Sequence, residues 1–217
     1  MLAKLVSAHI DPESICSATD AVADELVPAV LAHPGALKAF WMVHPTSGRV
    51  LAMTSWSDAA SLLAGQAADG SERAQIAERI GLRVETVQTL EIVAAHEPPA
   101  DDLDNLWVRA TCFEGIAADR IDHLREVYDQ TLSDQLRAGG FRGSYWLADR
   151  EARHGLALSF WSESTDLSRG ELNSRRRRHQ VERTLGCTVN LIAEYRAIGY
   201  ATNSTTDRRT RERSSAN

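Results

Sequence analysis

The side chains best suited to chemistry form one run, Arg175 to Arg178 followed by His179. A histidine titrates near neutral pH, so His179 could act as a base or as a haem ligand, and the alternative is a solvated helix surface. Successive residues of a helix are about 100° apart, so four arginines cannot face one ligand. We expect Arg178, which shares the apolar side with Val181 and Leu185, to point toward a carboxylate or a substrate oxyanion. The other three arginines are predicted to be solvated.

Tryptophans form the second group of candidates. Two of them, Trp41 and Trp146, lie in the first strand of a predicted hairpin, and Trp56 and Trp161 end the second strand. Indoles that line a cavity can stack on a flat aromatic ligand. The alternative is that all four are packing residues of the core.

Other patterns with a known chemistry are missing from the sequence. The remaining histidines do not form metal-ligand pairs, and there is no G-x-S-x-G, P-loop or G-x-G-x-x-G motif, so we expect no metal site. Isolated polar groups could lie near the mouth of a pocket, but spacing alone does not bring them together. The histidines are His9, His44, His123 and His154, and the polar groups are Glu114, Asp149, Glu163 and Tyr195.

The helices and strands that must position these residues can be predicted from the spacing of apolar residues and from the glycines, prolines and capping residues between them. Alternating apolar residues predict strands, and apolar residues at helical spacing between capping residues and glycines predict helices. Pro28 should kink or shorten the first helix. Gly81 and Gly186 are expected to end helices. The predicted strands are 3–10, 38–44, 49–55, 84–94, 106–113, 144–149, 155–160 and 188–198, and the helices begin near 12, 58, 71, 118, 162 and 173.

The same order of predicted strands and helices occurs twice along the sequence. Identical residues recur at a constant offset of 105, including Trp41 and Trp146, Trp56 and Trp161, and Arg73 and Arg178. Each copy is a β-α-β-β-α-β unit, the split pattern of ferredoxin-like folds. We predict an α+β protein with repeats at 1–95 and 106–200, a linker at 96–105 and a disordered tail at 201–217. The uncovered sheet faces of two such repeats can pair inside one chain and form a barrel.

Composition narrows the class of partner. The 217 residues carry a net charge of −6, which gives no reason to expect nucleic acid as a partner. No apolar run is long enough to span a membrane, and the short run at 5–10 does not suit a signal peptide. The three cysteines are scattered, as expected for reduced thiols. We therefore expect a cytoplasmic protein.

The strand–Trp–Ser–acid pattern at Ser55–Asp58 and its counterpart at Phe160–Glu163 resembles the dimeric α+β barrel superfamily, especially antibiotic-biosynthesis-monooxygenase-like domains. The resemblance covers about residues 2–199 as a tandem fusion. It implies an intramolecular pseudo-dimer, a possible further homodimer, and a fold shared by cofactor-independent monooxygenases, haem-degrading enzymes and small isomerases. The haem-degrading pattern is matched only by His179, because Ser7 and Thr111 replace its asparagine.

Three functions follow as hypotheses. The first is a monooxygenase without a cofactor that acts on a small aromatic or polyketide-like molecule, with Trp41, Trp56, Trp146 and Trp161 as binding residues and Arg178 or His179 orienting an oxyanion. The second is a tandem barrel that binds a small apolar or aromatic ligand without turnover. The third is haem binding or degradation through His179. Divergence between the copies favours at most one working site, in the C-terminal half.

Overall fold

The computed structural model describes residues 1–68, 72–99, 106–164 and 171–203. Contacts divide the chain into two compact units, Met1–Thr89 with Ala197–Asn217, and Leu90–Arg196. The division falls inside two long strands, so each of these strands contributes to both units. The predicted boundaries at 95 and 106 follow the sequence repeat and stay predictions, and the predicted tail lies mostly outside the described residues.

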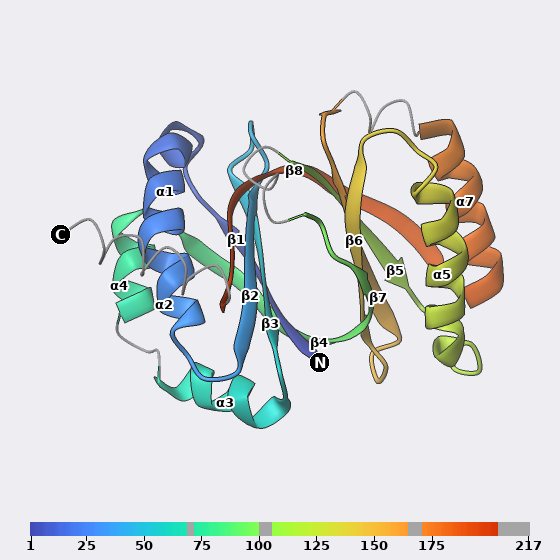
Figure 1. Ribbon diagram of the computed structural model, residues 1–217, viewed down its shortest axis with the longest axis horizontal. Helices are drawn as coiled ribbons and strands as arrows, with labels where there is room; N and C mark the ends of the chain where they lie inside the picture. The colour runs from blue at the N-terminus through green and yellow to red at the C-terminus, as the bar shows by residue number, and fades with distance from the viewer. Residues whose placement is uncertain (69–71, 100–105, 165–170, 204–217) are drawn as a thin grey trace. The chain divides into compact units, whose positions relative to one another are not determined.

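The first unit contains an antiparallel sheet with helices on one face (Figure 1). The central strand β3 pairs with β1 on one side and β2 on the other, with Leu2 opposite Trp56 at the start of the first ladder. The elements are β1 (Leu2–His9), α1 (Ile15–Ala21), α2 (Val27–Leu31), β2 (Ala36–Val43), β3 (Arg49–Trp56), α3 (Ala59–Ala68), α4 (Glu72–Arg79) and the beginning of β4 (Arg83–His96).

The second unit repeats this order of elements. Its central strands β5 and β7 pair with each other, β5 also pairs with β8, and β6 pairs with β7 and with the end of β4. Helices α5 and α7 cover one face of this sheet (Figure 1). The elements are β5 (Trp107–Glu114), α5 (Leu124–Gln135), β6 (Phe141–Asp149), β7 (His154–Trp161), α7 (Glu171–Leu185) and β8 (Thr188–Thr202).

Hydrogen bonding joins the described strands in the order β1-β3-β2-β8-β5-β7-β6-β4, which closes into a barrel. The predicted α+β class with helices on antiparallel strands is therefore confirmed. None of the helices among the described residues combines the length and the apolar character that a membrane span requires.

Helix ends and interruptions follow local chemistry. The segment before Pro28 forms a π-helical turn, Val22–Leu26, in which the Val27 N–H donates to the Val22 carbonyl. Proline has no N–H for the carbonyl four residues earlier, and Pro28 was predicted to kink or shorten the helix. The helical segment continues past Pro28 to Leu31, with the π-helical turn directly before it. Gly81 and Gly186 have positive φ angles of 68° and 60°, as expected for residues that end helices.

Each unit has its own apolar core between sheet and helices. In the first unit the core includes Trp41 and Trp56, and in the second it includes Trp146. Trp161 packs with Phe141 in a smaller cluster of the second unit. All four tryptophans are less than one tenth exposed, so the packing role that the sequence allowed for them is present.

Candidate functional site

A cavity of about 80 Å³ lies in the second unit, between the sheet and helices α5 and α7. Side chains alternate between the two faces of a strand, so residues 109, 111 and 113 of β5 all face the helices. The sheet also contributes Trp146 from β6 and Trp161 from β7. Each of the two helices contributes two polar or charged residues. The polar and charged lining residues are Arg109, Thr111, Thr131, Gln135, Ser159, Arg177 and Arg178.

Three guanidinium groups meet at this cavity. Arg109 on β5 has a side chain only 11% exposed and donates through Nε and Nη2 to the carboxylate of Glu194 on β8. Arg177 and Arg178 reach the cavity from α7 and are half-buried. Burial lowers the pKa of the Arg177 guanidinium, Asp134 opposes this effect, and the charge of Arg109 adds to it. The site is therefore positive and partly desolvated, which favours a bound anion.

The indoles form flat walls of the same cavity. The centroid of the Trp146 ring lies 4.8 Å from the centroid of the Phe113 ring and 5.7 Å from that of the Tyr128 ring. The Trp161 Nε1 donates to the Ser159 hydroxyl at 3.0 Å, so its polar atom is satisfied inside the protein. The apolar faces of these rings can contact a ligand, and a flat face suits a planar molecule.

Two residues of α5 add polar groups. The Thr131 hydroxyl donates to the Val127 carbonyl of its own helix at 2.8 Å. Gln135 is 9% exposed, and its Oε1 has no hydrogen-bond partner among the described residues. Buried polar atoms of native proteins nearly always have a partner, so this carbonyl oxygen needs an explanation.

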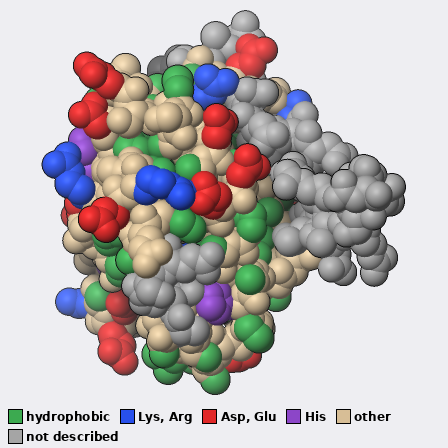
Figure 2. Space-filling view, turned by 90° about the vertical axis from the view of Figure 1, so that its left-hand side faces the viewer, with side chains coloured by type: hydrophobic (Ala, Val, Ile, Leu, Met, Phe, Trp, Pro, Cys, Tyr) green, Lys and Arg blue, Asp and Glu red, His purple; other side chains and the backbone are tan. Residues whose placement is uncertain are grey.

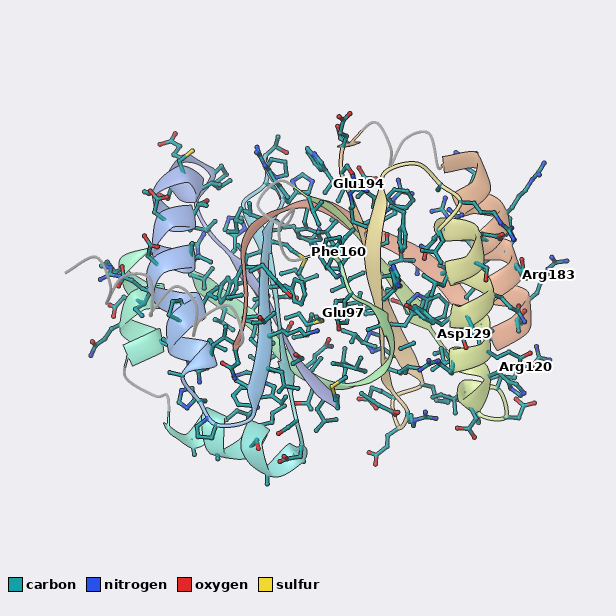
Figure 3. The ribbon with its side chains drawn as sticks, viewed as in Figure 1. Glu97, Arg120, Asp129, Phe160, Arg183 and Glu194 are labelled. Carbon is teal, nitrogen blue, oxygen red and sulfur yellow. The ribbon has the colours of Figure 1, made fainter. Side chains whose placement is uncertain are left out.

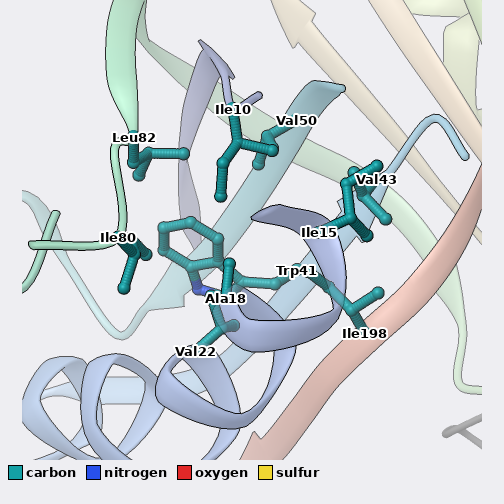
Figure 4. Close-up of a pocket in the computed structure, with 10 residues that line it drawn as sticks. All are labelled: Ile10, Ile15, Ala18, Val22, Trp41, Val43, Val50, Ile80, Leu82 and Ile198. Carbon is teal, nitrogen blue, oxygen red and sulfur yellow. The ribbon is translucent and has the colours of Figure 1, made fainter. Parts of the chain in front are cut away.

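A small void of about 10 Å³ lies beneath the helices of the first unit (Figure 4). All ten lining residues are apolar or aromatic, and Trp41 lies among them. Trp56 donates to the Thr54 hydroxyl at 3.0 Å, and its ring lies directly against Gly65, where even an added Cβ would come within 2.3 Å. A void of this size holds at most one water molecule.

Comparisons with solved structures identify the fold. The "putative monooxygenase" of Fusobacterium nucleatum superposes with a TM-score of 0.68 at 10% identity, over 93% of this chain and 94% of that one. An anthrone oxidase-like protein follows with 0.65 at 11% identity, over 93% of each chain. A ferredoxin-fold protein of Listeria monocytogenes related to antibiotic biosynthesis monooxygenases gives 0.51 at 7% identity, over 90% and 94%.

The chain has the dimeric α+β barrel fold. The predicted resemblance to this superfamily is therefore confirmed at the level of the fold. No model of a known protein family matches the sequence, and no curated protein matches it.

The residue proposed as a haem ligand and the size of the cavity do not fit haem. The side chain of His179 is 76% exposed, hydrogen-bonds to Glu182 at 3.0 Å and lies outside the cavity wall. Pockets that hold large ligands have volumes of about 300–1,000 Å³, several times that of this cavity. We therefore assign no role to haem.

Other polar candidates also lie outside the cavity wall. Glu114 accepts from Asn190 at 3.3 Å, and Asp149 accepts from the backbone N–H of Ala152 at 2.9 Å. Tyr195 is buried at 3% exposure and Glu163 is exposed. No group of histidine, cysteine and acidic residues in the described part of the chain could hold a metal ion.

The outer surfaces of the helices carry both acidic and basic side chains. Arg120 donates to the carbonyls of Arg183 and Thr184, at 2.8 and 3.1 Å, and so caps the end of α7. Figure 3 shows Arg120 and Arg183 on the outer side of the helices, whereas Glu194 lies at the sheet. Acidic and basic side chains are likewise interspersed on the face shown in Figure 2.

The sequence pointed to part of this site. Arg178 lines the cavity next to Val181, and Arg177, which was expected in solvent, is half-buried and lines it too. Two residues 100° apart can both border a cavity, because the long stem of arginine lets its head reach inward. Arg109 and Gln135 were missed, although a charge at a helix-facing position of an otherwise apolar strand was a usable signal for Arg109.

Proposed function

We propose that the second unit binds a small planar organic anion in the cavity beneath α5 and α7. The observation that carries this proposal is the lining itself. Among the described lining residues three are arginines and none is acidic, while two indoles supply flat apolar walls. Glu194 balances Arg109 from outside the cavity wall. A carboxylate, phenolate or enolate would complete this arrangement.

The size of the cavity restricts the ligand. About 10–15 Å³ suffices for one water molecule, and a cavity of about 150 Å³ accommodates benzene. At about 80 Å³ the cavity lies between these limits. A compact carboxylate fits as the side chains stand, and a single ring requires the half-buried Arg177 and Arg178 to swing outward. A polyketide of several fused rings is too large.

Oxygenation without a cofactor is the second part of the proposal. Its support is the fold shared with proteins named as a monooxygenase and as anthrone oxidase-like. No histidine or carboxylate stands in the described cavity wall, so the substrate would bind as a preformed anion whose charge the arginines stabilise. In such a reaction an activated methylene becomes a carbonyl. Dioxygen supplies that oxygen, its second atom leaves as water with both hydrogens, and the methylene carbon provides all four electrons.

We infer one working site in an intramolecular pair of ferredoxin-like repeats. Both units place a strand-end indole on a hydroxyl two residues earlier, Trp56 on Thr54 and Trp161 on Ser159. At the offset of 105, Leu26 and Val30 occupy the positions of Thr131 and Gln135. Apolar side chains thus replace the polar ones where the first unit has only a small void. Assembly into a homodimer stays a prediction that light scattering would test.

Binding is tested first, with a panel of acetate, benzoate and the hydroxybenzoates followed by calorimetry and tryptophan fluorescence. We expect one site per chain and at least tenfold weaker binding in the double variant Arg177→Met/Arg178→Met. The matched control is Arg175→Met/Arg176→Met, which removes two exposed arginines of the same helix. Equal loss in both variants, or no binding by any anion, would reject the site. Oxygen consumption with a compact anion that carries an activated methylene, such as the enolate of acetylacetone, then tests turnover separately.

A further inference from the structure

The unpaired carbonyl oxygen of Gln135 points to a second requirement of the ligand. Gln135 belongs to α5, lines the anion cavity and is nine-tenths buried, and its Oε1 has no partner in the described structure. A buried acceptor without a donor is destabilising, because it loses its hydrogen bonds to water. Gln135 shares the cavity wall with three arginines, and positive charge in the cavity favours an amide orientation that turns the oxygen, rather than the NH₂ group, toward it.

The cavity therefore makes two different demands on its occupant. The guanidinium groups that line the cavity favour a negative group, and the Gln135 Oε1 requires a hydrogen-bond donor. A simple carboxylate meets only the first demand. A carboxylate or enolate that also carries a hydroxyl meets both.

We propose that the ligand is a hydroxylated organic anion and that Gln135 is the specificity-determining residue that accepts a hydrogen bond from its hydroxyl. This proposal rests on the proposed function, since it concerns the same cavity. A site that contains a buried polar group selects strongly against an analogue that leaves the group unpaired. The first unit has no equivalent, because Val30 occupies the corresponding position.

Two matched pairs of probes measure the preference for a hydroxyl. Glycolate is compared with acetate, and 3- and 4-hydroxybenzoate are compared with benzoate, in the full-length chain by calorimetry. We expect at least one hydroxylated probe to bind about tenfold more tightly than its partner, the size expected for one buried hydrogen bond. Gln135→Met should reduce this ratio to about one while the affinities for acetate and benzoate change less than threefold.

Two further variants make the result decisive. The control Gln75→Met alters an exposed glutamine of the other unit and should keep the tenfold ratio. Gln135→Glu retains an acceptor, so it should keep the preference while it weakens every anion through charge repulsion, and it decides the matter if Gln135→Met does not fold. Equal binding within each pair in the wild type, or a preference that survives in Gln135→Met, overturns the role of Gln135 alone. If none of the anions binds, the proposed function fails as well.

Discussion

Arg109 donates from both Nε and Nη2 to one oxygen of Glu194, at 3.2 and 2.7 Å. The two residues face each other on the paired strands β5 and β8. Arg109 is mostly buried and Glu194 is about one third exposed, so the carboxylate holds the guanidinium at the edge of the cavity. The pair therefore connects the charge of the cavity to the stability of the sheet.

Replacement of Glu194 by glutamine separates these two effects. The variant Glu194→Gln removes one negative charge beside Arg109, so we expect anions to bind roughly three to ten times more tightly. The free energy of unfolding should fall by about 1 kcal/mol, since a charge-assisted hydrogen bond is weakened. Calorimetry and urea unfolding measure the two changes. Glu91→Gln, which removes an exposed partner of Arg150, is the control and should leave anion affinity unchanged. Weaker anion binding in Glu194→Gln would contradict this electrostatic role.

Filling the cavity should abolish binding without loss of stability. The double variant Thr131→Leu/Gln135→Val installs the residues of the first unit, and it removes the buried Gln135 Oε1, which has no hydrogen-bond partner among the described residues. We expect more than tenfold weaker anion binding and a free energy of unfolding equal to or above that of the wild type. Ser133→Ala on the exposed side of α5 is the control. Unchanged anion affinity in a folded double variant would place the ligand elsewhere.

Haemin should not recognise His179 specifically. The imidazole is exposed and bonded to Glu182, outside the cavity. We expect haemin titrations to give the same Soret spectrum and the same affinity for the wild type and His179→Ala. A Soret shift lost only in His179→Ala would show that haem binds through this side chain.

Glu182 should make stability depend on acid pH. The backbone N–H of Val189 and, to a lesser degree, His179 hold the pKa of its carboxyl below the ordinary value of 4.5. A lowered pKa stabilises the folded state above the unfolded-state pKa, and this contribution disappears as pH falls through the folded-state value. Glu182→Gln should therefore be destabilised at pH 7, and its difference from the wild type should shrink below about pH 4. Unfolding curves at both pH values check this, and a constant difference would be the contrary result.

The thiols should differ in reactivity. Burial is the main cause that raises the pKa of Cys112 and of Cys187 to about 11, with further contributions from Glu114 and Glu182 respectively, whereas Cys16 is exposed. At pH 8 only about one thousandth of each of these two thiols is ionised, and the thiolate is the reactive form. A chromogenic disulfide reagent should label one thiol quickly and two slowly. Cys16→Ser should remove the fast phase, and a fast phase that remains would contradict the assignment.

Much of the local structure could be predicted from residue order. Alternation along 49–55 and 155–160 predicted strands that are present as β3 and β7. Gly186 also predicted a helix end where one occurs. Such features depend on hydrogen bonds and steric contacts within a few residues, so neighbouring residues are enough to specify them.

The site followed from sequence only in part. Arg178 was expected to point inward because its helix neighbours Val181 and Leu185 are apolar. His179 carried the clearest chemistry in the sequence, yet its side chain lies in solvent beside Glu182. Val181 and Leu185 indicate which side of α7 packs on the sheet, but they do not decide whether a side chain at the border of that side reaches the cavity, as Arg177 does, or stays in solvent, as His179 does.

The sequence by itself determined the strands, the helices and their order, because these depend on short-range periodicity. Only the tertiary structure decided that Arg109, Gln135 and Arg177, on β5, α5 and α7, border one cavity. It also decided that the second unit keeps this space while Trp41 and its neighbours leave only a small void in the first. The physical reason is that a cavity is what remains after distant side chains have packed, and packing depends on volumes and distances that residue order does not contain.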